Sequence, residues 1–134
     1  MAASRQKRGR GFTLIELMIV ISILLILIAI AIPSYNRSIT RARESVLRQD
    51  LFQLRSLISQ YTLDKQKAPQ SLQDLVEAGY LKVIPVDPMT RTAETWVTEQ
   101  SDSLHSIDQT EPGIDDVHSG DQEPGSDGKP YSTW

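Results

Sequence analysis

Residues 12–32 read FTLIELMIVISILLILIAIAI and contain one charged side chain, that of Glu16. A helix of about 20 apolar residues matches the roughly 30 Å hydrocarbon core of a bilayer. The run is hydrophobic on every face, whereas a buried strand would be much shorter and a soluble core helix would carry a polar stripe. The sequence therefore predicts one membrane-spanning helix over these residues.

The helical pattern continues beyond Ile32. Apolar residues at spacings of three and four predict an amphipathic helix that leaves the membrane and ends at about Leu63. Pro33 lies within this helix, so we expect a kink or local unwinding there. The predicted apolar face consists of Tyr35, Ile39, Ala42, Val46, Leu54, Ile58 and Tyr61, with Leu47, Leu51 and Leu57 beside them.

Charge is distributed unevenly along the 134 residues, although the net charge is only −3. Residues 1–11 are basic and contain no acid, whereas residues 92–134 are acidic and contain one basic side chain, that of Lys129. Such an uneven distribution of charge along the chain favours a membrane-tethered protein over a free soluble enzyme. Arginines also follow the apolar segment, so the positive-inside rule alone does not set the topology.

The amino-acid composition and motifs exclude most kinds of catalytic site. The chain has no cysteine, which rules out disulfide scaffolds, thiolate zinc sites and cysteine nucleophiles. It has two histidines and no glycine-rich phosphate loop, and no Ser/His/Asp arrangement is visible. We therefore expect a non-enzyme without an organic cofactor.

The second half of the chain predicts a small α+β domain. Residues 71–78 form a short helix, because Ser71-Leu-Gln-Asp74 has the spacing of a capping box and Gly79 follows as a stop signal. Asp87-Pro88 predicts a turn within an extended segment. Residues 96–97 and 114–117 are expected to form strands of a small antiparallel sheet, with Trp96 in the core.

The tail of the chain, residues 114–134, predicts a loop because glycines and prolines interrupt any regular element. Acids in a glycine-rich loop can bind calcium, which takes six to eight oxygen ligands from side chains and backbone carbonyls. No EF-hand spacing is present. A solvated acidic loop without a metal is the alternative, and composition does not separate the two.

The segment Gly11-Phe12-Thr13-Leu14-Ile15-Glu16, which follows a basic leader, resembles the class III signal of type IV pilins and pseudopilins. Pro33 also matches the family pattern. The resemblance implies that a prepilin peptidase cleaves between Gly11 and Phe12 and that Phe12 is then N-methylated. It further implies that Glu16 pairs with the new N-terminal amine and sets the register between subunits.

Residues 79–90, GYLKVIPVDPMT, resemble a conserved stretch of the major (G-type) pseudopilin of type II secretion systems. This implies a pilin-like α+β fold with a cleaved leader (1–11), a transmembrane and filament-core helix (12–33) and a periplasmic domain (34–134). Within that domain we expect an amphipathic helix (34–63), a short helix (71–78) and an acidic β/loop region (92–134).

The resemblance also implies a function. The chain is expected to be a structural subunit of a pseudopilus that promotes protein export across the outer membrane. The implied location is the bacterial inner membrane, with the C-terminal domain in the periplasm, followed by assembly into a filament. The implied partners are further copies of the chain, the prepilin peptidase, an inner-membrane assembly platform and minor pseudopilins.

G-type pseudopilins carry a structural calcium ion in the C-terminal loop. The residues here that best match its acidic ligands are Asp121 and Asp127. Asp116, Glu123 and a backbone carbonyl near Ser119 are weaker candidates.

Three alternatives stay open at this level. The chain could be a type IV pilin for adhesion or motility, although such pilins often close a loop with a disulfide. It could take up DNA, but Glu44 and Asp50 interrupt the arginine series, so nucleic-acid binding is not expected. It could also be a secreted enzyme released after Ala31, because residues 29–31 resemble a signal-peptidase site. The arginine series comprises Arg37, Arg41, Arg43, Arg48 and Arg55.

Overall fold

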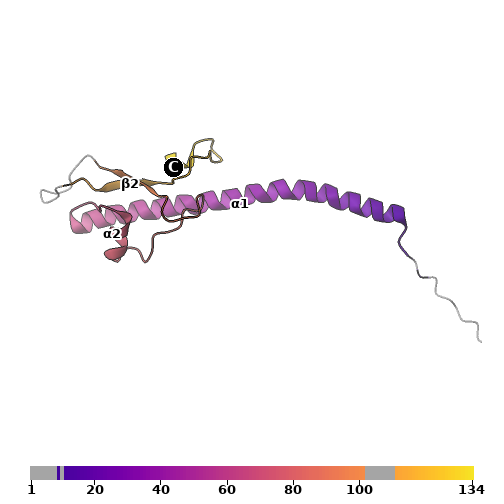
Figure 1. Cartoon of the computed structure of the whole chain (residues 1–134), viewed down its shortest axis with the longest axis horizontal. Coiled ribbons are helices and arrows are strands. Elements are labelled where there is room, and N and C mark those ends of the chain that lie inside the picture. The colour runs from indigo at the N-terminus through magenta and orange to yellow at the C-terminus, as the bar shows by residue number, and fades with distance from the viewer. Residues whose placement is uncertain (1–8, 10, 102–110) are drawn as a thin grey trace, which may run out of the picture. The chain divides into compact units, whose positions relative to one another are not determined.

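A computed structural model describes residues 9, 11–101 and 111–134 of the chain. Its elements are the helices α1 (Leu14–Lys65) and α2 (Leu72–Glu77), the strands β1 (Val97–Gln100) and β2 (Ile114–His118), and a short 3₁₀ helix, η1 (Tyr131–Thr133) (Figure 1). These elements confirm the α+β class. The chain divides into two compact units, Met1–Ser38 and Ile39–Trp134, which are described separately below.

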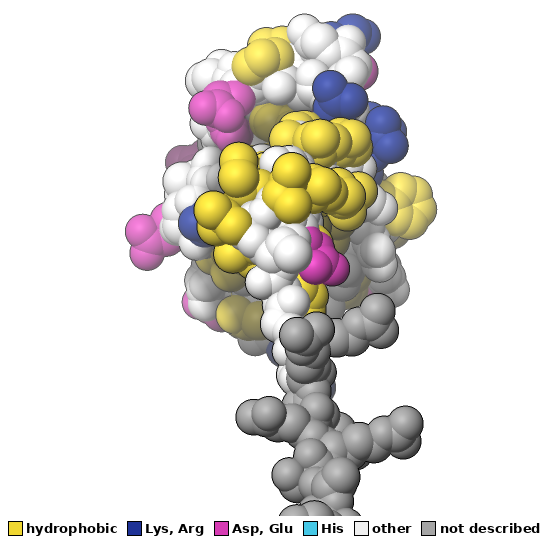
Figure 2. All heavy atoms as spheres, turned by 90° about the vertical axis from the view of Figure 1, so that its right-hand side faces the viewer, with side chains coloured by type: hydrophobic (Ala, Val, Ile, Leu, Met, Phe, Trp, Pro, Cys, Tyr) yellow, Lys and Arg dark blue, Asp and Glu magenta, His cyan; other side chains and the backbone are white. Residues whose placement is uncertain are grey.

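The first unit contains the apolar part of α1. The helix begins at Leu14, two residues later than expected, because Thr13 caps it: the Glu16 backbone N–H donates to Thr13 Oγ1 at 3.2 Å. α1 is long and apolar enough to cross a membrane. Figure 2, which faces the N-terminal end of α1, shows many hydrophobic side chains on the surface of the described residues.

The helix continues through Pro33 without interruption, so local unwinding, one of the two expected outcomes, does not occur, and a kink stays a prediction. Proline removes one hydrogen bond, the one that its own N–H would donate to the carbonyl of Ala29, and its ring crowds that carbonyl. The neighbouring hydrogen bonds of a long helix hold the backbone in helical geometry around such a single gap.

The second unit has its core on one face of α1. The buried apolar side chains there begin at Leu47 and recur at helical spacing, ending at Tyr61. The predicted face was wrong at its N-terminal end, because Val46 is 49 % exposed while the neighbouring Leu47 is fully buried. The core cluster consists of Leu47, Leu51, Leu54, Ile58, Tyr61, Leu72, Leu75, Trp96, Ile114, Val117 and Tyr131.

The short helix α2 follows the capping prediction. Both arms of the box between Ser71 and Asp74 are present, and Asp74 Oδ2 accepts hydrogen bonds from the backbone N–H groups of Ser71 (3.3 Å) and Gln70 (2.7 Å). Gly79 follows with a φ of 84°, the left-handed conformation that glycine adopts without a steric cost. Leu75 of α2 is fully buried in the core.

The strands β1 and β2 form an antiparallel pair, as expected. Val97 lies opposite His118 and Glu99 lies opposite Asp116. Trp96 comes directly before β1; its ring is buried and its Nε1–H donates to the Pro85 carbonyl at 2.8 Å, which confirms its place in the core.

Candidate functional site

The residues of the predicted processing site are accessible. Gly11 and Phe12 precede α1, and Phe12 is 83 % exposed. The backbone around Gly11 is open, since a Cβ placed there would meet no atom within 4 Å. A peptidase could therefore reach the bond between them in non-helical backbone. Cleavage at this bond stays a prediction.

Glu16 also has a role in the local structure at the start of α1, in addition to the pairing that the family resemblance implies. It lies in the first turn of α1, where a carboxylate interacts favourably with the helix dipole. Thr13 and Glu16 also have the spacing of a capping box, and one arm of it is formed by the Glu16 N–H and Thr13 Oγ1. This signal was visible in the sequence and was missed. The predicted pairing of Glu16 with the Phe12 amine stays a prediction.

In the second unit, a buried carboxylate on α1 holds the C-terminal loop. Glu44 is 5 % exposed, and its Oε1 accepts hydrogen bonds from the Ser126 N–H (2.8 Å) and the Tyr131 hydroxyl (2.9 Å). The Ser126 hydroxyl donates to Oε2 at 2.6 Å. Glu44 thus joins two segments that lie more than 80 residues away in sequence.

The same contacts set the protonation of this site. Burial opposes ionisation of Glu44, but the hydrogen bonds from Ser126 and Tyr131 and the charge of Arg48 outweigh it and lower the pKa of Glu44. Burial and the hydrogen bond to Glu44 raise the pKa of Tyr131 to about 12. Around neutral pH the pair is therefore a carboxylate that accepts from a neutral phenol.

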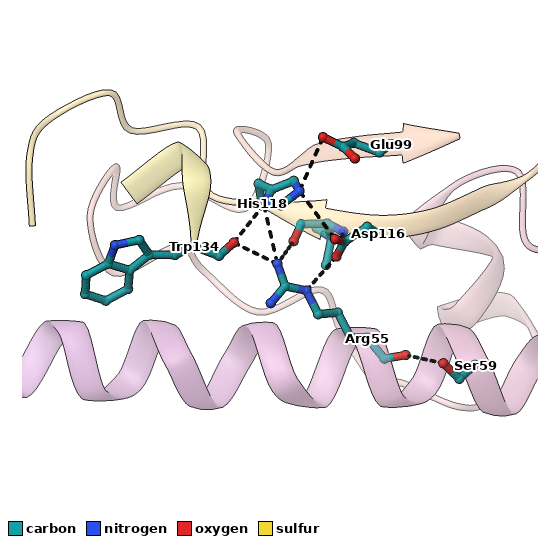
Figure 3. Close-up of polar contacts among 7 residues, drawn as sticks. Arg55, Ser59, Glu99, Asp116, His118 and Trp134 are labelled. Atoms are coloured by element: carbon teal, nitrogen blue, oxygen red, sulfur yellow. Dashed lines mark hydrogen bonds and ion pairs between the residues drawn. The ribbon is translucent and has the colours of Figure 1, made fainter. Parts of the chain in front are cut away.

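A second polar network attaches β2 and Trp134 to α1 (Figure 3). Arg55 Nε donates to Asp116 Oδ1 at 2.5 Å, and its Nη2 donates to the backbone oxygens of Val117 (2.9 Å) and Trp134 (2.7 Å). The guanidinium of Arg48 lies over the Trp134 ring, 4.3 Å from its centre. Arg48 and Arg55 therefore bind their own chain, which weakens the case for a DNA-binding arginine row.

A third contact joins the Asp87-Pro88 turn to the segment after β2. Asp87 is fully buried; its Oδ2 accepts from the Ser119 hydroxyl at 2.5 Å and its Oδ1 accepts from the Met89 N–H at 2.8 Å. The backbones are close here as well, because a Cβ on Gly120 would come within 2.3 Å of the Thr95 carbonyl oxygen. The predicted turn is thus an anchor for the C-terminal loop.

The predicted calcium ligands lie in separate small turns. Asp121 Oδ1 accepts from the Glu123 N–H at 2.9 Å, and Asp127 Oδ1 accepts from the Lys129 N–H at 3.0 Å. Asp127 also lines a cleft of about 440 Å³ together with Arg48, Arg55 and Lys129.

Among residues 9, 11–101 and 111–134, one group of three side chains could hold a metal ion, and it contains neither Asp121 nor Asp127. Calcium at these aspartates would therefore depend on backbone carbonyls for most of its ligands, and it stays a prediction. The group is formed by Glu99, Asp116 and His118, whose ligand atoms lie within 4.8 Å of one another. Asp116 was a calcium candidate from sequence, whereas Glu99 and His118 were missed.

The chain matches one family model and several known proteins. The family described as "Prokaryotic N-terminal methylation motif" matches residues 6–32. The type II secretion system core protein G of Klebsiella pneumoniae is 34% identical over 98 residues, which cover 61% of this chain and 70% of that protein. The protein of the same name from Escherichia coli is 33% identical over 97 residues, covering 60% of this chain and 67% of that protein.

A different relative matches a shorter part of the chain. The type IV major fimbrial protein FimA of Dichelobacter nodosus is 48% identical over 61 residues, which cover 46% of this chain and 38% of that protein. No solved structure gives a significant match.

Proposed function

The chain belongs to the pilin-like proteins as a G-type pseudopilin, and we propose that it is a structural subunit of a type II secretion pseudopilus. The extent of the similarity to core protein G carries this proposal. That similarity covers 61% of the chain, far more than the N-terminal motif at residues 6–32. The similarity therefore extends beyond the N-terminal signal segment that pilin-like proteins have in common.

The proposed mechanism is processing followed by assembly. A prepilin peptidase removes residues 1–11, and the exposed Phe12 amine is methylated. The apolar surface of α1 then leaves the bilayer and is buried against other copies of the helix, because exposing it to water costs about 25 cal/mol per Å². Glu16 supplies the negative charge that neutralises an N-terminal amine inside this apolar bundle.

In this proposal the precursor spans the inner membrane once, and the unit Ile39–Trp134 lies in the periplasm and on the outside of the filament. Within this unit, the networks around Glu44 and Arg55 hold β2 and the C-terminal loop on α1. Its role is structural, because the energy for assembly comes from partner proteins and export needs no catalytic group on the subunit.

Deletion of the gene tests the proposal. If the chain is a secretion subunit, the deletion strain should accumulate exported proteins in the periplasm and keep its surface pili. Returning the wild-type gene should restore export. The similarity to FimA supports one second candidate, a type IV pilin. Loss of surface pili with normal export would establish that candidate and overturn the secretion proposal.

We also propose calcium as a ligand of the C-terminal loop, at Asp121 and Asp127. Each of these carboxylates accepts a backbone hydrogen bond at Oδ1, and Oδ2 is the oxygen that would bind the cation. Calcium added to the chelator-treated full chain in detergent is expected to raise the melting temperature of the folded unit, since a ligand that binds only the folded state stabilises it. The rise should be absent with magnesium.

Asp115→Asn serves as the matched control for this calcium experiment, because Asp115 is an exposed acid outside the loop. It should retain the rise, and Asp121→Ala and Asp127→Ala should each lose it. The calcium site would be contradicted if calcium raised the melting temperature of all three variants equally, or if it did not raise that of the wild-type chain.

A further inference from the structure

We propose that Glu99, Asp116 and His118 form a binding site for a divalent transition metal, with zinc as the ion that fits it. The site bridges β1 and β2 and is distinct from the calcium ligands considered above, apart from the weaker candidate Asp116. Figure 3 shows the three side chains converging on one point above α1. The inference does not depend on the secretion role.

The orientation of His118 indicates a metal ligand. Its Nδ1 lies 2.7 Å from the backbone oxygen of Trp134, which can only accept a hydrogen bond, and 3.4 Å from Arg55 Nη2, which can only donate one. The contact with Trp134 is much the shorter, so we assign the proton to Nδ1. In the neutral ring the lone pair is then on Nε2, which faces the two carboxylates. A metal-binding histidine characteristically donates its other ring N–H to a carbonyl or carboxylate in this way.

The distances from His118 Nε2 to the two carboxylates are those of a metal site. His118 Nε2 is 3.4 Å from Glu99 Oε1 and 3.5 Å from Asp116 Oδ2. A charged N–H···O⁻ hydrogen bond would be about 2.7–2.9 Å long. Tetrahedral zinc with bonds of about 2.0–2.1 Å places its ligand atoms about 3.3–3.4 Å apart. The nitrogen therefore stands at the separation from both oxygens that a shared zinc ion requires.

The two carboxylates lie opposite each other, and the cation in contact with them, Arg55, pairs with Asp116 Oδ1. The strand register places Glu99 directly opposite Asp116, and like charges in this position are destabilising. Asp116 Oδ1 is already used by Arg55 Nε and by the Val117 N–H at 2.7 Å, which leaves Oδ2 toward His118. Arg55 thus orients the carboxylate, and the cation at Oδ2 is supplied by a metal.

The ligand set selects the kind of ion. One imidazole nitrogen and two carboxylate oxygens suit zinc, whereas calcium and magnesium prefer oxygen ligands alone. A fourth position is left for water. Bound zinc would tie β1 to β2, and through the His118–Trp134 hydrogen bond it would also fix the last residues of the chain.

The test is titration of the full chain, purified in detergent and freed of metal by a chelator, with zinc chloride in a calorimeter. We expect one zinc ion per chain. Cobalt chloride should produce the visible absorbance bands of a four-coordinate site. Glu99→Gln and His118→Gln should each weaken zinc binding by about tenfold or more, since even the loss of a supporting hydrogen bond costs about 10–100-fold.

Two controls make the result specific. Asp115→Asn lies on β2 beside Asp116 but is exposed and outside the group, so it should bind zinc as the wild type does. His105→Gln removes the other histidine, which lies outside the described residues, and should also leave binding unchanged. Because the Glu99 side chain is 65% exposed, Glu99→Gln should fold normally, as its unchanged metal-free melting temperature would show.

Absence of stoichiometric binding would overturn the proposal. Binding that survives in both Glu99→Gln and His118→Gln, or that disappears in His105→Gln, would overturn it as well.

Discussion

Glu44→Ala is expected to lower the free energy of unfolding of the unit Ile39–Trp134 by about 3 kcal/mol. The substitution leaves the Ser126 N–H, the Ser126 hydroxyl and the Tyr131 hydroxyl without their shared acceptor. A buried donor left unpaired costs about 1–3 kcal/mol, and hydrogen bonds to a charged group lie at the upper end of the range. Denaturant unfolding of the full chain in detergent measures this loss. Tryptophan fluorescence reports on this unit alone, because the two tryptophans, Trp96 and Trp134, both belong to it.

Glu77→Ala is the matched control, since Glu77 is an exposed glutamate at the end of α2. It should change the free energy of unfolding by less than about 0.5 kcal/mol. Equal effects of the two substitutions would show that Glu44 does not anchor the C-terminal loop.

The pH dependence of stability gives a second readout of Glu44. Its pKa in the folded state is lower than that of an unfolded glutamate, so its charge stabilises the fold above the unfolded pKa of about 4.3. That contribution is lost as the pH falls through the lower folded value. The stability difference between wild type and Glu44→Gln should therefore stay constant from neutral pH to about pH 5 and narrow below about pH 4. A difference that does not narrow on acidification would contradict this assignment of charge.

Glu16→Val is expected to abolish filament formation while processing continues. Under the proposed function, the N-terminal amine of a processed subunit would be left without its negative partner inside the apolar bundle. Breaking a buried ion pair by removing one partner costs about 3–5 kcal/mol, and the cost recurs at every subunit added. The measurement is the amount of sheared filament recovered from cells that express the assembly proteins.

Ser22→Val is the control for this experiment. Ser22 lies in the same apolar helix, and its hydroxyl donates to the Met18 carbonyl at 2.7 Å. Its replacement removes a polar group without leaving a charge unpaired, so filaments should form. Filaments from Glu16→Val at the wild-type level would show that the carboxylate does not neutralise the amine during assembly.

Features that depend on neighbouring residues could be predicted from the sequence. The apolar helix follows from a run of hydrophobic residues, and α2 follows from the spacing of Ser71 and Asp74. The antiparallel pair was placed within a few residues of β1 and β2. The apolar face of α1 was less well predicted, because both Val46 and Leu47 fit the spacing and only the packing against the rest of the core selects Leu47.

Contacts between distant segments could not be predicted. Nothing near Glu44 in the sequence indicates Ser126 or Tyr131, and in the sequence Glu44 was simply an acid that interrupts the arginines. The group of Glu99 and His118 depends on the register of β1 against β2, which single-strand patterns do not fix.

The mass of the mature chain tests the central claim most directly. The chain would be purified from membranes of cells with and without a prepilin peptidase, and its intact mass and N-terminal peptide determined. We expect loss of residues 1–11 and a single methyl group on Phe12 only when the peptidase is present. A chain that keeps residues 1–11 in the presence of the peptidase, or one that begins at Ile32, would contradict the assignment as a processed pseudopilin.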